Sequence, residues 1–143
     1  MERTFLVLGA LFGFTGVALG AFGTHALRAK LTPERLATFE TGIRYHLIHA
    51  LALFAVVLTG RFRYATIVGG AETGTAATSY FGSIGGWAVA AGWLFVAGIV
   101  LFSGSLYALA TTGNRRWGAV TPIGGVCWLA GWALLAAAAW TGN

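Results

Sequence analysis

Hydrophobic residues fill four long stretches of this chain, and charged residues are confined to the short segments between them. No Asp, Glu, Lys or Arg occurs at 4–27, 45–60, 73–114 or 117–143. A helix needs about 20 consecutive apolar residues to cross a hydrocarbon core of about 30 Å. The pattern therefore predicts an all-α integral membrane protein, a bundle of four transmembrane helices at about 4–22, 33–59, 83–110 and 122–141. Residues 1–143 form a single domain in this interpretation.

The first two helices carry start signals of different quality. Only Arg3 precedes the first apolar stretch as a basic residue, and no clean cleavage site follows it, so we expect a retained span rather than a removed signal peptide. Thr32-Pro33-Glu34 predicts the start of the second helix, with Thr as N-cap and Pro at the first helical position. Its first part, up to about Thr41, is amphipathic and is expected outside the core or at the membrane interface.

The connections further along the chain are less regular. The longest predicted loop runs from Arg61 to Gly82 and is rich in Gly, Thr and Ala. A contact with a partner protein is expected within it, at about Ala71 to Tyr80. Thr121 and Pro122 predict the start of the fourth helix, again with Thr as N-cap.

Glycines recur along the first helix, at Gly9, Gly13, Gly16 and Gly20. Spacings of three and four residues keep them along one side, where small residues let a neighbouring helix approach closely. We expect this face to pack inside the monomer; homodimerisation through it is the alternative.

Composition supports the membrane interpretation. Charged residues make up 9% of the chain and hydrophobic residues 57%, whereas soluble proteins carry roughly 25% charged residues. A soluble chain with this composition would have to be a buried helical core within a larger assembly. The net charge is +5, but the basic residues form pairs at the ends of apolar runs, Arg61 with Arg63 and Arg115 with Arg116. This placement is typical of topology signals and headgroup anchors rather than of a nucleic-acid surface. It leaves the orientation of the termini open.

The second helix holds the charged pair nearest to an apolar stretch. Glu40 and Arg44 are four residues apart, in the order that favours an ion pair on a helix. We interpret them as a structural ion pair that anchors the helix at the interface. The alternative is a buried pair lining a polar pathway.

Three histidines are the plausible ligands or proton carriers. His46 and His49 share a face of the second helix, and His25 follows the first helix. Tyr107, which faces the same way as Ser103, could join them in a ligand site. The histidine spacing matches no specific metal motif, so a metal site is not predicted. A structural role, with hydrogen bonds to neighbouring backbone or hydroxyl groups, is the main expectation for these side chains.

Catalytic patterns are missing from the sequence. It contains no Asp, and its four acidic residues lie outside or at the boundary of the apolar stretches, so no nucleophile–base–carboxylate set is visible. No phosphate-binding glycine loop of known spacing occurs either. We therefore expect a protein that is not an enzyme.

Several sequence strings together resemble one family. They are Gly20-Ala21-Phe22-Gly23-Thr24-His25-Ala26-Leu27, Phe39-Glu40-Thr41-Gly42-Ile43-Arg44-Tyr45-His46, His49-Ala50-Leu51-Ala52-Leu53, Leu101 to Tyr107, Thr121-Pro122-Ile123-Gly124-Gly125, and Leu129-Ala130-Gly131-Trp132. In this order they resemble the YgdD-like family of small inner-membrane proteins, to which the animal transmembrane protein 256 is similar. The resemblance covers nearly the whole chain.

The resemblance implies a four-helix, multi-pass protein of the cell inner membrane without an established activity. His25 and His49 fall where the family pattern has histidine, whereas His46 falls where glutamine is more usual. The loop at about 64–82 is longer than in the family pattern, and the chain lacks the basic C-terminal tail of some relatives.

Three functional hypotheses follow. The first is a non-enzymatic accessory or packing subunit of a larger membrane complex, with the bilayer and a membrane protein as partners. The second is a binding protein for haem, quinone, lipid or metal, with the ligand held near His25, His46, His49 and Tyr107; the sequence names no cofactor. The third is a small transporter or channel.

Overall fold

The computed structural model describes residues 1–69 and 84–141, which are helical almost throughout. The elements in chain order are α1 (Glu2–Phe22), the π-helix η1 (Gly23–Leu27), α2 (Pro33–Gly69), α3 (Gly86–Gly98), the π-helix η2 (Ile99–Ser103), α4 (Gly104–Thr112), the 3-10 helix η3 (Arg115–Ala119) and α5 (Thr121–Thr141). Within the described residues, 4 segments are long and apolar enough to cross a membrane: Glu2–Leu27, Pro33–Gly60, Gly86–Thr112 and Arg115–Thr141. The predicted all-α protein with four transmembrane helices is confirmed.

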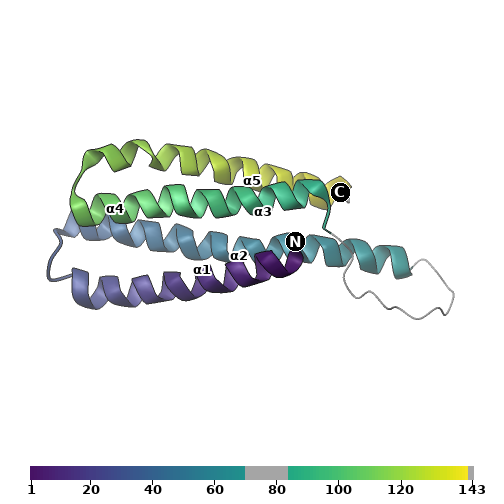
Figure 1. Ribbon diagram of the computed structural model, residues 1–143, viewed down its shortest axis with the longest axis horizontal. Helices are drawn as coiled ribbons and strands as arrows, with labels where there is room; N and C mark the ends of the chain where they lie inside the picture. The colour runs from purple at the N-terminus through teal and green to yellow at the C-terminus, as the bar shows by residue number, and fades with distance from the viewer. Residues whose placement is uncertain (70–83, 142–143) are drawn as a thin grey trace.

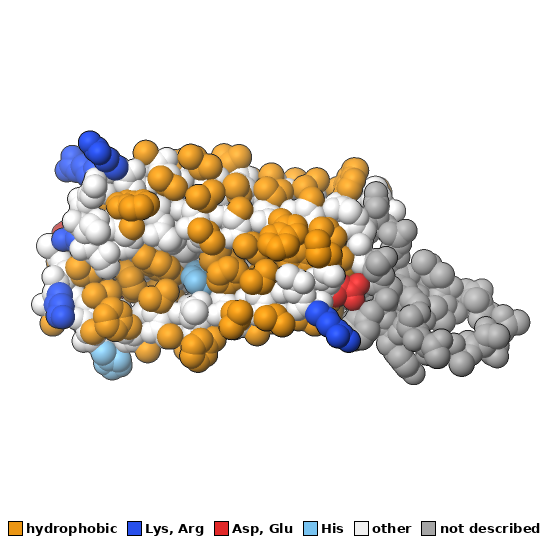
Figure 2. All heavy atoms as spheres, in the orientation of Figure 1, with side chains coloured by type: hydrophobic (Ala, Val, Ile, Leu, Met, Phe, Trp, Pro, Cys, Tyr) orange, Lys and Arg blue, Asp and Glu red, His pale blue; other side chains and the backbone are white. Residues whose placement is uncertain are grey.

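The spans lie side by side with neighbours running in opposite directions (Figure 1). α1 packs along α2, α2 packs against α3, η2 and α4, and α5 packs against α3 and η2. Both chain ends lie at the same end of the molecule, and α2 extends past them. Figure 2 shows Lys and Arg side chains gathered at the two ends, with hydrophobic side chains between them. This distribution suits a protein that crosses a bilayer.

Helix α2 begins where the sequence predicts and ends later. The Arg35 N–H donates to the Thr32 hydroxyl oxygen at 3.4 Å, so Thr32 caps the helix as expected. The prediction of a loop from Arg61 is wrong for residues 61–69, which continue α2 as a helix to Gly69. No proline or glycine interrupts this stretch before Gly69, so the helix has no reason to stop at the membrane boundary. The rest of the predicted loop, with its expected partner contact, lies outside the described residues.

The start of α5 also differs from the expectation. Thr121 is the first residue of the helix rather than its cap, and its hydroxyl bonds to the Ser105 hydroxyl at 2.8 Å. The preceding 3-10 turn η3 carries the chain over from α4. The Thr121 hydroxyl therefore joins two spans instead of closing a helix end.

The amphipathic start of α2 forms a small core of its own. Phe39 is buried together with Leu27 and Ala110, apart from the main cluster of the bundle. The Arg35 Nε donates to the Ala110 carbonyl at 2.6 Å, near the end of α4 at Gly113, whose φ is 72°. A cation at a helix C-terminus is favourable because it faces the negative end of the helix dipole. This contact holds the start of α2 against α4.

Two glycine-containing seams bring the helices close together. The buried residues of α5 are Gly124, Trp128, Gly131, Leu135 and Ala138, a spacing of four and three that is typical of left-handed helix packing. In α1 the buried residues Phe5, Gly9 and Gly16 follow the same repeat. A Cβ at Gly9 would meet the Phe54 ring at 2.9 Å, and one at Gly16 would meet Leu47 at 2.6 Å.

The expected packing face on α1 is therefore only partly right. A Cβ at Gly13 would meet nothing within 4 Å, and one at Gly20 would make ordinary contact with Ile43 at 3.7 Å. The seam instead continues into η1, where a Cβ at Gly23 would meet the Phe39 ring at 2.8 Å. A repeat of seven residues, rather than alternating steps of four and three between glycines, keeps the backbone against α2.

Candidate functional site

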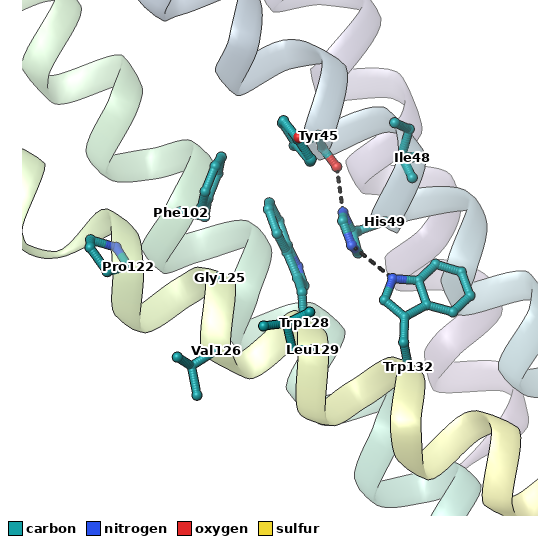
Figure 3. Close-up of a pocket in the computed structure, with 10 residues that line it drawn as sticks. All are labelled: Tyr45, Ile48, His49, Phe102, Pro122, Gly125, Val126, Trp128, Leu129 and Trp132. Atoms are coloured by element: carbon teal, nitrogen blue, oxygen red, sulfur yellow. Dashed lines mark hydrogen bonds between the residues drawn. The ribbon is translucent and has the colours of Figure 1, made fainter.

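His49 ties α2 to α5 in the middle of the membrane. Its Nδ1 bonds to the Tyr45 carbonyl at 2.8 Å, and the Trp132 indole N–H donates to its Nε2 at 3.2 Å. A carbonyl only accepts and an indole N–H only donates, so His49 is a neutral imidazole with its proton on Nδ1. Both ring nitrogens are thus occupied (Figure 3).

Trp128 lies flat against the same imidazole. The two ring centres are 3.7 Å apart and the planes differ by 2°. The Trp128 indole N–H donates to the Phe95 carbonyl at 3.3 Å, and a Cβ at Gly98 would clash with the indole. Glycine at 98 therefore allows Trp128 to fill the space between α2, α3 and α5.

His46 makes a second tie, to α1 and α4 rather than to α5. Its Nδ1 is 3.1 Å from the Tyr107 hydroxyl, and its Nε2 is 3.5 Å from the Thr15 hydroxyl. The Thr15 hydroxyl donates to the Leu11 carbonyl at 2.9 Å, so the His46 Nε2–H donates to Thr15 and the Tyr107 O–H donates to Nδ1. A Cβ at Gly42 would meet the Tyr107 ring at 2.7 Å. The chain of hydrogen bonds joins α4, α2 and α1.

These hydrogen bonds cross from helix to helix at one depth, so they do not form a path along the spans. Ser103, which the sequence places on the Tyr107 face, is fully buried, and its hydroxyl has no hydrogen-bond partner among the residues described here. The arrangement gives no support to the transporter or channel hypothesis, which needs a polar route between the two membrane surfaces.

The structure separates the histidines that the sequence grouped. His25 is exposed in η1, whereas His46 and His49 are buried and bond to different helices. Within residues 1–69 and 84–141, no group of three or more His, Cys, Asp or Glu side chains could hold a metal. A haem or metal ligated by these histidines would first have to displace their present hydrogen bonds.

A groove runs between α2 and α5, with His49 at its floor (Figure 3). Its first compartment has a volume of about 520 Å³ and is lined by Tyr45, Ile48, His49, Phe102, Pro122, Gly125, Val126, Trp128, Leu129 and Trp132. Its second compartment has a volume of about 440 Å³ and is lined by Ala55, Leu58, Thr59, Trp132, Leu135, Ala136 and Ala139. We call the two together the α2–α5 groove. Trp132 lines both compartments.

The two tryptophans of the groove have different exposures. Trp128 is 4% exposed and belongs to the floor, whereas Trp132 is 43% exposed and belongs to the wall. Trp132 also lies at the middle of the 21-residue helix α5. The boundary between the compartments therefore lies near the middle of the bilayer.

Sequence reasoning named His49 as a candidate ligand or hydrogen-bonding residue and missed the aromatic residues around it. Tyr45 and His49 are four residues apart on α2, and Trp128 and Trp132 are four apart on α5. Residues at this spacing share a helix face, so two aromatic faces on two spans were a signal that could have indicated this site.

Glu40 and Arg44 do not form the expected ion pair. Both side chains are exposed, and no ion pair joins them in the part of the chain that the structure describes. An exposed pair gains little because ordering two long side chains offsets most of the attraction. The prediction fails for this reason, and the Arg44 charge remains available.

Relatives of the chain are known by sequence. Residues 19–125 match the family described as "Protein of unknown function (DUF423)". The chain is 39% identical to the UPF0382 membrane protein YwdK of Bacillus subtilis over 137 residues, which cover 96% of each chain. The chain belongs to this family. The resemblance to the YgdD-like family that the sequence strings indicated is confirmed.

Other members of the family match over a similar length. The UPF0382 inner membrane protein YgdD of Escherichia coli strain K12 is 36% identical over 134 residues, which cover 94% of this chain and 87% of that protein. The UPF0382 membrane protein SH2409 of Staphylococcus haemolyticus is 38% identical over 133 residues, or 93% and 92% of the two chains. No solved structure matches the chain. The names of these relatives and the four candidate spans agree in making this a multi-pass membrane protein.

Proposed function

We propose that this protein is a non-enzymatic protein of the cell inner membrane that holds the hydrocarbon part of a lipid-soluble molecule in the α2–α5 groove. The observation that carries the proposal is the groove itself, two compartments of about 520 and 440 Å³. Each is within the range of about 300–1,000 Å³ that is common for small-molecule sites. Both are lined mainly by aromatic and aliphatic side chains.

The packing of the groove floor supports the proposal. Trp128 is held by Gly98, by the Phe95 carbonyl and by the stacked His49 ring. A floor that is already ordered loses little conformational freedom when a ligand binds. The contacts that hold Trp128 in place also distinguish this groove from an ordinary lipid-facing surface of the bundle.

The lining favours binding of hydrocarbon over metal binding or catalysis. None of the residues that line the two compartments is a carboxylate, and the His49 nitrogens are both hydrogen-bonded. General acid–base chemistry needs a titratable group within reach of the substrate. The lipid form of the small-molecule hypothesis therefore fits this site better than its haem or metal forms.

Filling the groove tests the proposal. A Cβ at Gly125 would make an ordinary contact with the Phe102 ring at 3.9 Å, and Gly125 lines the first compartment, so Gly125→Leu adds a side chain there. Overlap of the leucine with a bound acyl chain is expected to cost about 1–3 kcal/mol, as overpacking does in a protein core. This cost is expected to weaken lipid retention at least about fivefold. Native mass spectrometry of the full chain, purified in mild detergent with defined lipids, measures this retention.

Gly13→Leu is the matched control, because a Cβ at Gly13 has nothing within 4 Å. It adds the same side chain outside the groove and is expected to retain lipid as the unmodified protein does. Equal retention by the Gly125→Leu variant would contradict the proposal, provided that both variants keep the thermal midpoint of the parent.

A second candidate is an accessory subunit of a larger membrane complex. The supporting observation is that α2 continues to Gly69, whereas its membrane-spanning segment ends at Gly60. The extra helix corresponds to about 14 Å and continues α2 past its membrane-spanning segment. Affinity purification in mild detergent at native expression level is expected to recover a stoichiometric membrane-protein partner. A lone monomer under these conditions would count against this role.

A further inference from the structure

Arg44 is the basic residue of α2 that is nearest in sequence to the residues lining the first compartment. Arg44 and Ile48 are four residues apart on α2 and share a helix face, and Ile48 lines the compartment. Arg44 also stands at the end of the charge-free stretch 45–60. Its guanidinium group can extend toward the headgroup region while its alkyl chain stays against the hydrocarbon.

No protein carboxylate neutralises Arg44 in the described chain. The side chain is exposed, and the one acidic residue a turn away, Glu40, does not pair with it. A guanidinium group matches the geometry of phosphate oxygens and binds them with two parallel hydrogen bonds. The first compartment next to this part of α2 is lined mainly by apolar side chains. A cation next to an apolar compartment suits an amphiphile with an anionic head.

The depth of the compartment indicates what the apolar part is. Along α5 the first compartment extends from Pro122 to Trp132, which corresponds to about 15 Å of helix. Half of a hydrocarbon core of about 30 Å has this thickness. A compartment one leaflet deep fits an acyl chain that enters from one side of the membrane. A transmembrane helix of a partner protein would need a continuous groove through both leaflets, and Trp132 stands between the two compartments.

We infer that the first compartment binds an anionic phospholipid, with one acyl chain in the groove and the phosphate group on Arg44. This inference rests on the proposed function, since it names the lipid that the groove holds. Phospholipid is the source of the phosphate because the acyl chain and the phosphate must belong to one molecule.

The test compares two lipids and two arginines. The full chain, purified in mild detergent, is titrated with phosphatidylglycerol and with phosphatidylcholine of the same acyl chains, and retained lipid is measured by native mass spectrometry. One cation near a membrane surface is expected to favour the anionic lipid about fivefold. Arg44→Gln is expected to remove this preference while phosphatidylcholine is retained as before. Arg28→Gln, which removes an exposed arginine outside the groove, is expected to keep it.

Different outcomes overturn different claims. Equal retention of the two lipids by the parent protein, or an unchanged preference in Arg44→Gln, would overturn the assignment of the headgroup to Arg44 and leave the groove as a hydrocarbon site. Failure of the parent protein to retain either lipid would overturn the proposed function. A co-purifying protein that is lost in Gly125→Leu while lipid retention stays unchanged would show that a partner helix occupies the groove.

Discussion

Replacing Gly124 by alanine is expected to lower the free energy of unfolding by more than about 3 kcal/mol, at the upper end of what overpacking costs. A Cβ at this position would clash with the backbone nitrogen of Phe102 and would lie 2.8 Å from its Cα. These are backbone atoms, so the new methyl group can be accommodated only if α5 moves away from η2. Reversible unfolding in mixed detergent–SDS micelles, followed by near-UV circular dichroism, measures the change.

Gly13→Ala provides the matched control for this substitution. Both residues are glycines in transmembrane helices, but a Cβ at Gly13 has open space around it. Its expected effect is small and stabilising, about 0.4–1 kcal/mol, because alanine restricts the unfolded chain more than glycine does. Similar losses at both positions would mean that the close contact between α5 and η2 is not present in the protein.

Replacing His49 by alanine is the second substitution with a large expected effect. It removes the ring that is stacked on Trp128 at 3.7 Å, leaves a cavity in a buried position, and takes away the acceptor of the Trp132 indole N–H. Deleting a large buried side chain costs about 2–5 kcal/mol, most of it through lost packing. The same unfolding measurement is expected to show a loss in the middle of this range.

His49→Phe separates packing from hydrogen bonding. Phenylalanine keeps an aromatic ring against Trp128 but cannot bond to the Tyr45 carbonyl or to Trp132. Hydrogen bonds between membrane helices average only about 0.6 kcal/mol, so this variant is expected to lose about 1 kcal/mol. A loss as large as that of His49→Ala would show that the hydrogen bonds, rather than the stacked rings, hold α2 and α5 together.

The fold of this protein could be predicted from its sequence because the bilayer imposes one strong requirement. Apolar stretches of sufficient length must become helices, since every backbone polar group in the bilayer needs a partner within the protein. The charge-free stretches at 4–27, 45–60, 73–114 and 117–143 therefore identified the spans. The same requirement says nothing about residues beyond the membrane, which is why the continuation of α2 to Gly69 was not expected.

The contacts between helices were harder to predict. Periodicity placed Gly9 and Gly16 on a packing face, but it could not distinguish them from Gly13, because steps of three and four residues are equally close to a helical turn. Only the direction of the neighbouring helix decides between them. Likewise, the sequence grouped Tyr107 with His46 and His49 as candidate ligand residues, and Tyr107 does contact His46. It gave no sign of Trp132, the partner of His49, which is distant in the chain and comes close only through tertiary packing.

The position of Trp132 has a consequence for the movement of lipids. Because this residue lines both compartments and its indole N–H donates to His49, an acyl chain would have to pass the Trp132 side chain to move from one compartment to the other. A headgroup travelling along the groove would also meet apolar walls and no polar track. Under the proposed function, the groove therefore suits lipid that stays within its own leaflet, which is the opposite of what a lipid scramblase requires.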